Sequence, residues 1–296
     1  MNKKKFFASL LITLLVLTIV FACTVLFPLG NENLKSFLDP DNETMKNVLV
    51  VGVDKDGTRA DVIMLVCVKH EDRTINIISI PRDTQIKLSD GKVSKINACM
   101  GKENPDELLT DKVRQLTGLP VNSFCKVSFE GLRNVFDILG GVEYNVPIDM
   151  DYDDPVQDLH IHLKAGKQRL DGAQIEGLLR FRSGYADADL GRIDTQQDFL
   201  KEAIKQKLSL RYIFKFPAVI NELNKNFDTD LAALDVFSLA FDCMRNKGVN
   251  KITLPGEPKY MYGTSYFVAD KNSAEQIGNM LGTAKAPSGL NDKVIE

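Results

Sequence analysis

The chain of 296 residues contains 37 Lys and Arg residues against 40 Asp and Glu residues, which gives a net charge of −3. Three of the lysines, Lys3, Lys4 and Lys5, stand at the very start, so the rest of the chain carries a net charge of −6. So acidic a chain lacks the positive field that nonspecific nucleic-acid binding requires, and we expect no nucleic-acid partner. With 44% hydrophobic and 26% charged residues, the composition also excludes disordered, collagen-like and coiled-coil proteins. Any anion site must therefore be a local cluster of Arg and Lys.

The first 30 residues differ from the rest of the chain. The lysines precede an uncharged run in which residues 6–27 supply 22 mostly apolar residues, enough for a helix across a bilayer core. A cleaved signal peptide would have a shorter apolar region and a small-residue cleavage site, and this sequence shows neither. Cys23 gives a weaker alternative, lipoprotein processing. The lysines predict a protein of the cell membrane with a single span, a cytoplasmic N-terminus and an extracellular remainder.

The composition along the chain predicts four segments. Residues 1–30 form the cytoplasmic N-terminus and transmembrane anchor, and residues 31–46 form a polar linker. Residues 47–284 are expected to make one domain, because neither an internal repeat nor a low-complexity stretch divides them. Residues 285–296 are expected to be a loose C-terminal tail.

Three continuous apolar runs predict the first strands, at residues 47–54, 61–68 and 74–80. Strands of this kind indicate a sheet that is covered on both faces. The connections, residues 55–60 and 69–73, are too short for a parallel crossover, so these strands are expected to be antiparallel neighbours. The end of the first strand, the start of the second and the end of the third then meet at one edge of the sheet.

That edge of the sheet receives three residues that could carry chemistry. Asp54 ends the first run, Asp61 begins the second, and Arg82 follows the third. Carboxylate oxygens suit a hard divalent cation, and a neighbouring guanidinium suits an anion. Because Asp is also common at strand ends and turns, a purely structural role is the alternative for both carboxylates.

The remaining elements are predicted from periodicity and caps. Asp171 is expected to cap a helix that turns Ile175, Leu178 and Leu179 inward. Residues 149–158 are predicted to be a solvated acidic loop. The other helices are expected at residues 106–117, 128–139, 189–208, 212–224, 231–246 and 273–281, and further strands at 142–146 and 251–254. These elements together predict an α/β fold.

Four cysteines and three histidines are spread through the chain beyond the anchor. The cysteines, Cys67, Cys99, Cys125 and Cys243, are even in number and permit disulfides, but they are too few for a disulfide scaffold. There is no Cys-x-x-Cys pair, and His160 and His162 merely alternate along a predicted strand. A structural zinc site is not expected from this spacing.

Two arginines in the segment 178–197 are the strongest candidates for an anion site. Arg180 and Arg182 are two residues apart. In an extended backbone they point to the same side and form a phosphate clamp, whereas in a helix they diverge by about 200°. The structural alternative is that they only neutralise the acidic residues 149–158.

The same segment continues with a polar stripe at helical spacing. Asp189, Arg192 and Gln196 follow at intervals of three and four residues, and the stripe then becomes apolar at Leu200 and Ala203. Polar residues at positions that a core would occupy suggest the wall of a pocket. The structural alternative is a surface ion pair between Asp189 and Arg192, worth a few tenths of a kcal/mol.

An ordered series of motifs resembles the LytR-CpsA-Psr (LCP) family of cell-wall glycopolymer transferases. The motifs are Gly52-Val-Asp54, Arg59-Ala-Asp61, Ser79-Ile-Pro-Arg-Asp83, Lys95-Ile-Asn-Ala98, Asp137-Ile-Leu-Gly-Gly-Val142, Leu170-Asp-Gly172 and Arg180-Phe-Arg182 with Asp189-Leu-Gly-Arg192 and Gln196-Gln197. They span residues 48–208, and the stretch up to residue 270 is also similar to the family's C-terminal part. Seven motifs in one order make the resemblance specific.

The resemblance implies both a fold and a reaction. The fold is a single LCP-type catalytic domain over residues 47–284, an α/β domain whose central mixed sheet is flanked by helices, preceded by one transmembrane helix. The reaction is the Mg²⁺-dependent transfer of an anionic glycopolymer, such as wall teichoic acid or capsule, from a polyprenyl-pyrophosphate carrier to a peptidoglycan hydroxyl, which forms a phosphodiester. The implied partners are this carrier-linked glycopolymer, peptidoglycan and the membrane.

The resemblance also implies roles for individual residues. Asp54 and Asp61 hold Mg²⁺, with Mn²⁺ as the alternative ion. The substrate-binding residues are Arg82, Lys95, Arg180, Arg182, Arg192 and Gln196, and the catalytic group is Asp54, Asp61, Arg82, Asp189 and Arg192. Asp189 and Gln196 keep the arginines in place. These roles suit phosphoryl transfer, which depends on positioning and on neutralising developing charge.

Two departures from the family pattern leave other functions open. Thr195 stands before the Gln pair where the family often has Arg, so one cation is missing. The loop between Asp54 and Asp61 is also short. The alternatives are a non-catalytic envelope sensor that binds polyprenyl phosphate, and a hydrolase of the polyprenyl-pyrophosphate carrier.

Overall fold

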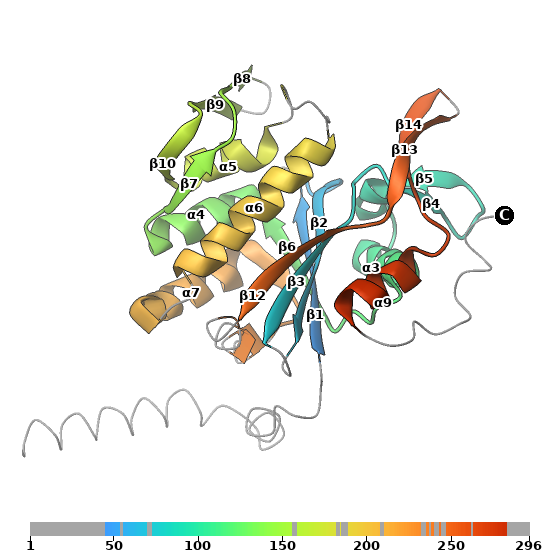
Figure 1. Ribbon diagram of the computed structural model, residues 1–296, viewed down its shortest axis with the longest axis horizontal. Coiled ribbons are helices and arrows are strands. Elements are labelled where there is room, and N and C mark those ends of the chain that lie inside the picture. The colour runs from blue at the N-terminus through green and yellow to red at the C-terminus, as the bar shows by residue number, and fades with distance from the viewer. Residues whose placement is uncertain are drawn as a thin grey trace, which may run out of the picture. The chain divides into compact units, whose positions relative to one another are not determined.

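A six-stranded sheet forms the centre of the computed structural model, with the order β11-β6-β1-β2-β3-β12 (Figure 1). Its strands are β1 (Met45–Val53), β2 (Ala60–Lys69), β3 (Thr74–Ser79), β6 (Ser123–Ser128), β11 (Phe227–Thr229) and β12 (Gly248–Thr253). The first three strands are antiparallel neighbours, as the short connections predicted. β6 runs parallel to β1 and β12 runs parallel to β3, so the sheet is mixed.

The structure describes residues 45–53, 56–69, 73–155, 159–181, 184, 189–207, 210–231, 235–236, 238–239, 243, 247–261 and 263–282. All of them belong to the second of two units into which the chain divides, residues 1–44 and 45–296. Among these described residues, no helix is both long enough and apolar enough to cross a membrane. The span predicted at residues 6–27 lies outside the described residues.

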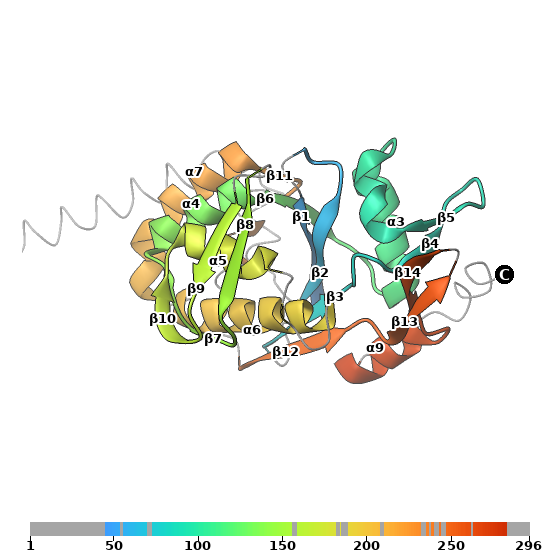
Figure 2. The same cartoon turned by 90° about the horizontal axis from the view of Figure 1, so that it is seen from above.

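Helices cover both faces of the sheet, as the continuous apolar strands predicted (Figure 2). On one face, Leu109 and Val113 of α3 (Pro105–Thr117) and Ile277 of α9 (Ser273–Leu281) join the main core. On the other face lie α4 (Phe129–Leu139), α5 (Gly172–Arg180), α6 (Asp189–Lys207) and α7 (Phe216–Asn226). The side chains of Leu200 and Ile204 on α6 pack against Met64, Ile75 and Ile77 of the sheet.

Local signals in the sequence account for several element boundaries. Asp171 caps α5 with a capping box, in which its carboxylate accepts from the Gln174 backbone N–H at 2.9 Å. The helix predicted at residues 212–224 is instead a 3₁₀ helix, η3 (Leu210–Lys215), followed by α7. Pro217 explains this break, because proline is favoured in the first turn of a new helix. Of the helix predicted at residues 231–246, the structure describes only residues 231, 235, 236, 238, 239 and 243, of which the last five are helical.

The prediction of an acidic loop at residues 149–158 is wrong for its first half. Residues Met150–Asp154 form β8, which pairs with β9 (Leu159–Leu163) in an antiparallel hairpin. Only alternate residues of β9 are buried, so the inward face carries the packing while the acids face solvent.

Further short elements were not predicted. They include β4 (Gln85–Lys87), β5 (Val93–Lys95), η2 (Ile96–Gly101), β10 (Gly166–Leu170), β13 (Gly256–Met261) and β14 (Thr264–Ala269). β10 pairs with β7 (Val142–Val146), a strand that was predicted at these residues.

Cys67, Cys99, Cys125 and Cys243 are all free thiols. Burial raises the pKa of the Cys67 thiol to about 12, and burial is also the main cause that raises the pKa of Cys99 to about 11. Thiols with pKa values this high stay protonated and are poor nucleophiles. These two cysteines are therefore small apolar residues of the core.

Candidate active site at one edge of the sheet

The edge at which β1, β3 and β6 end and β2 begins carries the first pair of predicted residues. The Arg82 Nη1 atom donates to the Asp61 Oδ1 atom at 2.9 Å, and each side chain is about one-fifth exposed. Val53 at the end of β1 is the cross-strand partner of Ala60, the residue before Asp61. The up-down-up order thus brings Asp61 and Arg82 together as expected. Asp54, which follows Val53, lies outside the described residues.

Lys95 stands beside the segment that carries Arg82. The Asn97 backbone N–H donates to the Arg82 carbonyl oxygen at 3.1 Å, which fixes the two motifs side by side. The Lys95 Nζ atom forms an ion pair with Asp83 at 3.0 Å and lies 5.7 Å from the centre of the Tyr266 ring. Each charged side chain of this pair is between a quarter and a third exposed, so the ammonium group is oriented but still reaches water.

Arg180 reaches the same edge from helix α5. Its guanidinium lies 4.8 Å from the centre of the Phe129 ring, a favourable stacking geometry, and its Nη1 atom donates to Glu176 Oε1 at 2.7 Å. Phe129 begins α4 directly after Ser128, and Ser128 is the parallel partner of Val53. The aromatic ring therefore holds Arg180 next to the end of β1.

Glu176 links Arg180 to a second arginine. Its other carboxylate oxygen, Oε2, accepts from Arg133 Nε at 2.9 Å, and the Glu176 side chain is only 8% exposed. A buried carboxylate that accepts from two guanidiniums fixes the rotamers of both arginines. The carboxylate of Glu176 lies one turn before Arg180 on the same helix.

Helix α6 carries polar side chains into the interior beside this edge. Arg192 and Gln196 are 3% and 4% exposed, so the polar stripe predicted from the sequence does face inward. Gln196 Nε2 donates to the Leu179 carbonyl oxygen at 2.8 Å, next to Arg180. Gln197 Nε2 donates to Ser79 Oγ at 2.7 Å, three residues before Arg82.

The adjacent glutamines, Gln196 and Gln197, thus connect α6 to α5 and to β3, the two elements that lead to Arg180 and Arg82. Gln196 holds the end of α5, and Gln197 holds the end of β3 and, through a second bond of 2.9 Å, the Ile252 carbonyl oxygen of β12. Figures 1 and 2 both show the N-terminal part of α6 beside α5 and the sheet. Thr195, which stands where a further cation was expected, is buried and donates to the Gly191 carbonyl oxygen at 3.0 Å.

Three predicted site residues cannot be placed as side chains. Asp54 and Arg182 lie outside the described residues, and Asp189 begins α6 but only its backbone is described. Phe181, between the two arginines, has extended backbone angles and is 3% exposed. Arg180 is the last helical residue, so the chain leaves the helix at the point where the two arginines were predicted to align.

Sequence reasoning missed several residues that organise this edge. Glu176 could have been found, because it lies four residues before Arg180 on the same helix face. Asp83, directly after Arg82, belongs to a recognised motif but was given no role. Phe129 and Gln197 offered no local signal, since their contacts depend on the packing of elements distant in sequence.

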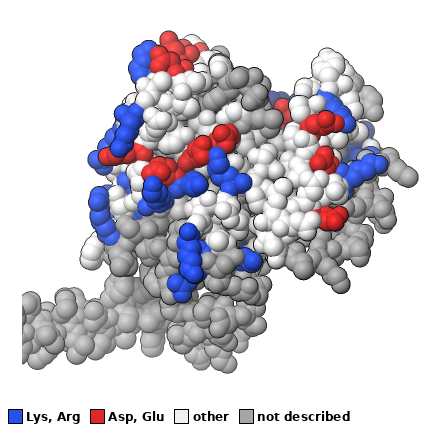
Figure 3. All heavy atoms as spheres, viewed as in Figure 1, with Lys and Arg blue, Asp and Glu red and all other residues white. Residues whose placement is uncertain are grey.

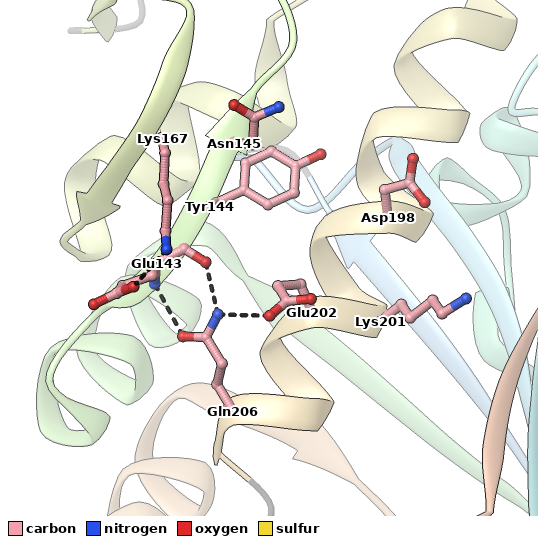
Figure 4. Close-up of a pocket in the computed structure, with 8 residues that line it drawn as sticks. All are labelled: Glu143, Tyr144, Asn145, Lys167, Asp198, Lys201, Glu202 and Gln206. Carbon is pink, nitrogen blue, oxygen red and sulfur yellow. Dashed lines mark hydrogen bonds and ion pairs between the residues drawn. The ribbon is translucent and has the colours of Figure 1, made fainter.

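A separate hollow of about 480 Å³ lies between β7 and the later turns of α6. Figure 4 shows its lining, which is Glu143, Tyr144, Asn145, Lys167, Asp198, Lys201, Glu202 and Gln206 (Figure 4). Gln206 bonds the backbone of Glu143 through both ends of its amide, at 3.0 and 2.7 Å. No residue predicted from the sequence to carry chemistry lines this hollow.

The geometry at the sheet edge defines a class of protein. Arg82, Lys95 and Arg180 surround an edge that also carries the Asp61 carboxylate, each held by an acid or an aromatic ring. In a chain of net negative charge, such a local group of oriented cations suits the binding of a phosphate-like anion. Fold and edge together define an α/β protein with a group of oriented cations at one edge of its central sheet.

Comparison with known proteins gives the family. The sequence model of the LytR_cpsA_psr family matches residues 29–283, and the chain belongs to this family. The resemblance drawn from the seven motifs is thereby confirmed.

Relatives and solved structures agree with this assignment. TagV of Bacillus subtilis (strain 168), called a polyisoprenyl-teichoic acid–peptidoglycan teichoic acid transferase, is 26% identical over 266 residues, or 85% of this chain and 68% of TagV. The crystal structure of B. subtilis TagV matches with a TM-score of 0.70 at 24% identity, over 81% of this chain and 96% of that one. TagU of Bacillus licheniformis, which bears the same description, is 28% identical over 262 residues, or 86% of this chain and 81% of TagU. A structure of TagT bound to LI-WTA matches with a TM-score of 0.65 at 22% identity, over 81% and 92% of the two chains.

Proposed function

We propose that this protein transfers an anionic glycopolymer from a polyprenyl-pyrophosphate carrier to a peptidoglycan hydroxyl, forming a phosphodiester. Family membership supports the proposal, as do the names of the relatives, which describe teichoic acid transferases. The observation that carries it is the sheet edge, where Arg82 beside Asp61 and Arg180 on Phe129 meet the end of β1. A pyrophosphate is the anion that needs several oriented cations at once.

The side chains at the edge suggest how the reaction proceeds. The acceptor hydroxyl oxygen forms a bond to the phosphorus that carries the glycan, and the bond from that phosphorus to the bridging oxygen breaks. The leaving group is polyprenyl phosphate, and the hydroxyl proton passes to a carboxylate at the edge. Arg82, Lys95, Arg180 and Arg192 neutralise the charge that gathers on the phosphate oxygens, and this electrostatic term is the main source of rate in phosphoryl transfer.

The donor set at the edge fits a divalent metal. Asp61 offers a hard carboxylate oxygen, the ligand that Mg²⁺ and Mn²⁺ prefer. Asp54, the next residue in the sequence after Val53, is proposed as the second carboxylate ligand. A bound Mg²⁺ would neutralise pyrophosphate oxygens. Arg82, Lys95 and Arg180 would orient the same group from the protein side.

The substrate would be presented at a membrane surface. The apolar residues 6–27, preceded by three lysines, support a single-pass anchor with the N-terminus in the cytoplasm and the enzyme domain outside the cell. Such an anchor holds the domain close to a lipid-linked donor, which raises the effective concentration of the donor.

One experiment tests this function. The full chain, purified in detergent, is incubated with a polyprenyl-pyrophosphoryl oligosaccharide, peptidoglycan oligomers and Mg²⁺, and the products are identified by mass spectrometry. We expect a phosphodiester conjugate that is lost with Arg82→Ala and kept with the matched surface variant Lys201→Ala. Free phosphorylated sugar alone would show a hydrolase instead, and binding without turnover would show a sensor.

A further inference from the structure

The β8–β9 hairpin brings two acids and two histidines onto one exposed face. In the register of the hairpin Asp153 pairs with His160, and Asp151 pairs with His162. Because side chains alternate along a strand, these four residues share one face, while Leu159, Ile161 and Leu163 face the core. Figure 3 shows acidic side chains gathered at the tip of the molecule where Figure 1 places β8 and β9 (Figure 3).

The atoms on this face lie close together. His160 Nδ1 is 2.5 Å from Asp153 Oδ1, and His162 Nε2 is 3.5 Å from the same oxygen. One ligand atom from each of Asp153, His160 and His162 lies within 4.8 Å of the other two. All three side chains are more than half exposed, so they can adjust their rotamers at small cost.

The fourth residue acts on a different atom. His162 Nδ1 lies 2.7 Å from Asp151 Oδ1. An imidazole that donates its Nδ1–H to a carboxylate presents Nε2 as an acceptor, and this arrangement is the usual one for a metal-bound histidine. The Nε2 atom of His162 is also the atom that faces Asp153.

We infer that this hairpin face binds a divalent metal ion of intermediate softness, and that the ion it ordinarily binds is Zn²⁺. The ligands are Asp153 through a carboxylate oxygen, His162 through Nε2 and His160 through a ring nitrogen, and water completes the shell. Two imidazoles and one carboxylate suit Zn²⁺ rather than Mg²⁺ or Ca²⁺, which prefer oxygen ligands. Asp151 is a positioning residue, because it orients the His162 ring.

The geometry needs only small shifts of these exposed side chains to reach this state. Zinc bonds of about 2.0–2.2 Å place tetrahedral ligand atoms about 3.4 Å apart. The separation of 3.5 Å between His162 Nε2 and Asp153 already meets this value. When the metal binds between them, His160 and Asp153 move apart from 2.5 Å, and any proton held between them is released to water.

Metal binding would fasten the two strands of the hairpin to each other. The inner face of β9 packs tightly on α5, since a Cβ atom at Gly177 would lie 3.4 Å from Ile161. The hairpin therefore supports the helix that carries Glu176 and Arg180, although it is separate from the sheet edge. The inference rests on the hairpin alone and does not depend on the transferase reaction.

Calorimetric titration tests the site. The full chain, purified without a histidine tag, is titrated with ZnCl₂ in detergent and excess MgCl₂, which saturates any site built from carboxylates alone. We expect one Zn²⁺ per chain, with at least a tenfold loss of affinity in His160→Ala, His162→Ala and Asp153→Asn. Asp149→Asn removes the same charge from the segment just before the hairpin and should change the affinity less than twofold.

Three further measurements sharpen the result. Asp151→Asn, whose amide oxygen still accepts from His162, should keep more affinity than Asp151→Ala. Zn²⁺ should raise the midpoint of thermal unfolding in the unmodified chain but not in the ligand variants, and His160→Asn serves if His160→Ala does not fold. The spectrum with Co²⁺ should lack the intense thiolate band that ligation by a free cysteine would give. Absence of Zn²⁺ binding, equal binding by all three ligand variants, or a thiolate band would overturn the inference.

Discussion

Helix α6 carries polar side chains along its whole length, and its two halves place them differently. In the first half, Arg192, Gln196 and Gln197 are almost fully buried and bond to neighbouring elements. In the second half, Lys201 and Gln206 line a hollow that opens to water (Figure 4). Burying a polar group costs free energy unless it is hydrogen-bonded, whereas a solvated one costs little.

This contrast separates polar groups that need partners inside the protein from those that water can satisfy. The hollow has a volume of about 480 Å³, but its charged side chains are solvated. The hydrogen bonds of its Gln206 side chain only join the surface of α6 to the backbone of β7. In the buried half each polar group needs a partner inside the protein, and Gln196 and Gln197 find theirs in α5, β3 and β12. The buried side chains of Arg192 and Gln196, and not those that line the hollow, are therefore the part of α6 that we propose for the anion site.

The largest expected effect comes from the carboxylates at the sheet edge. Replacing both Asp54 and Asp61 with Ala should reduce transfer by about 10³-fold, or roughly 4 kcal/mol, because both proposed metal ligands are lost. Removing divalent ions with a chelator should reduce transfer by a similar factor, and Mg²⁺ should restore it only in the unmodified chain. In the hollow, Glu202→Gln removes an equivalent charge and should leave the rate within twofold. A double variant that transfers at the unmodified rate would refute the metal assignment.

The buried amide of Gln197 should matter for stability. Gln197→Leu leaves the Ser79 hydroxyl and the Ile252 carbonyl without their donor, which should lower the free energy of unfolding by about 1–3 kcal/mol. Gln206→Leu in the hollow should cost less than about 0.5 kcal/mol, because its partners reach water. Urea denaturation followed by circular dichroism measures both. Equal losses in the two variants would remove the distinction between the two halves of α6.

Lysine variants of Arg180 and Arg182 test whether the shape of the guanidinium matters when the charge is kept. Arg180→Lys and Arg182→Lys keep the charge but lose the planar fork and, at Arg180, the stacking on Phe129. Transfer should fall by tenfold or more in each, about 1.4 kcal/mol of transition-state stabilisation. The reverse exchange in the hollow, Lys201→Arg, should have no measurable effect. If both lysine variants fold normally and transfer at near-normal rates, the two arginines contribute only screened surface charge and do not clamp the anion.

The smallest expected effect is the pH dependence of stability due to Lys251. Burial alone would lower the pKa of its ammonium group, but hydrogen bonds of 2.7 and 2.6 Å to Asp194 and Asp198 raise the pKa above its ordinary 10.5. A pKa raised by folding stabilises the protein fully below pH 10.5, and the contribution disappears as the pH rises through the folded value. We expect a loss of a few tenths of a kcal/mol on alkaline titration. The same titration of Lys251→Met should be flatter, and a steeper curve would contradict the assignment.

The parts of the fold that the sequence predicted are those with an uninterrupted local signal. β1, β2 and β3 are continuous apolar runs, and α5 begins at the Asp171 capping box. In the β8–β9 hairpin, the alternation of His160 and His162 indicated β9, but β8 was not predicted because acids dominate it and leave no apolar run. Its strand character comes from cross-strand pairing, which a single sequence does not display.

The site divides in the same way. Asp61 and Arg82 were predicted to meet, because strand order and loop length alone determine where strand ends lie. Arg180 was identified as a cation, but its anchoring on Phe129 depends on how α5 packs against the start of α4. Contacts of this kind arise from tertiary packing, and the residues that make them carry no periodic or capping signal.

The outer position of β12 governs the order in which the molecule can be completed during synthesis. β1, β2 and β3 have short connections in the sequence and can pair as soon as this part of the chain is free to fold, yet β3 obtains its second neighbour only when residues 248–253 arrive. Until then the row of unsatisfied backbone groups along Thr74–Ser79 is a template for pairing with other chains. A nascent chain that stalls before residue 248 would present this open edge, and so would a product truncated there, which makes aggregation rather than partial activity the expected fate of such fragments.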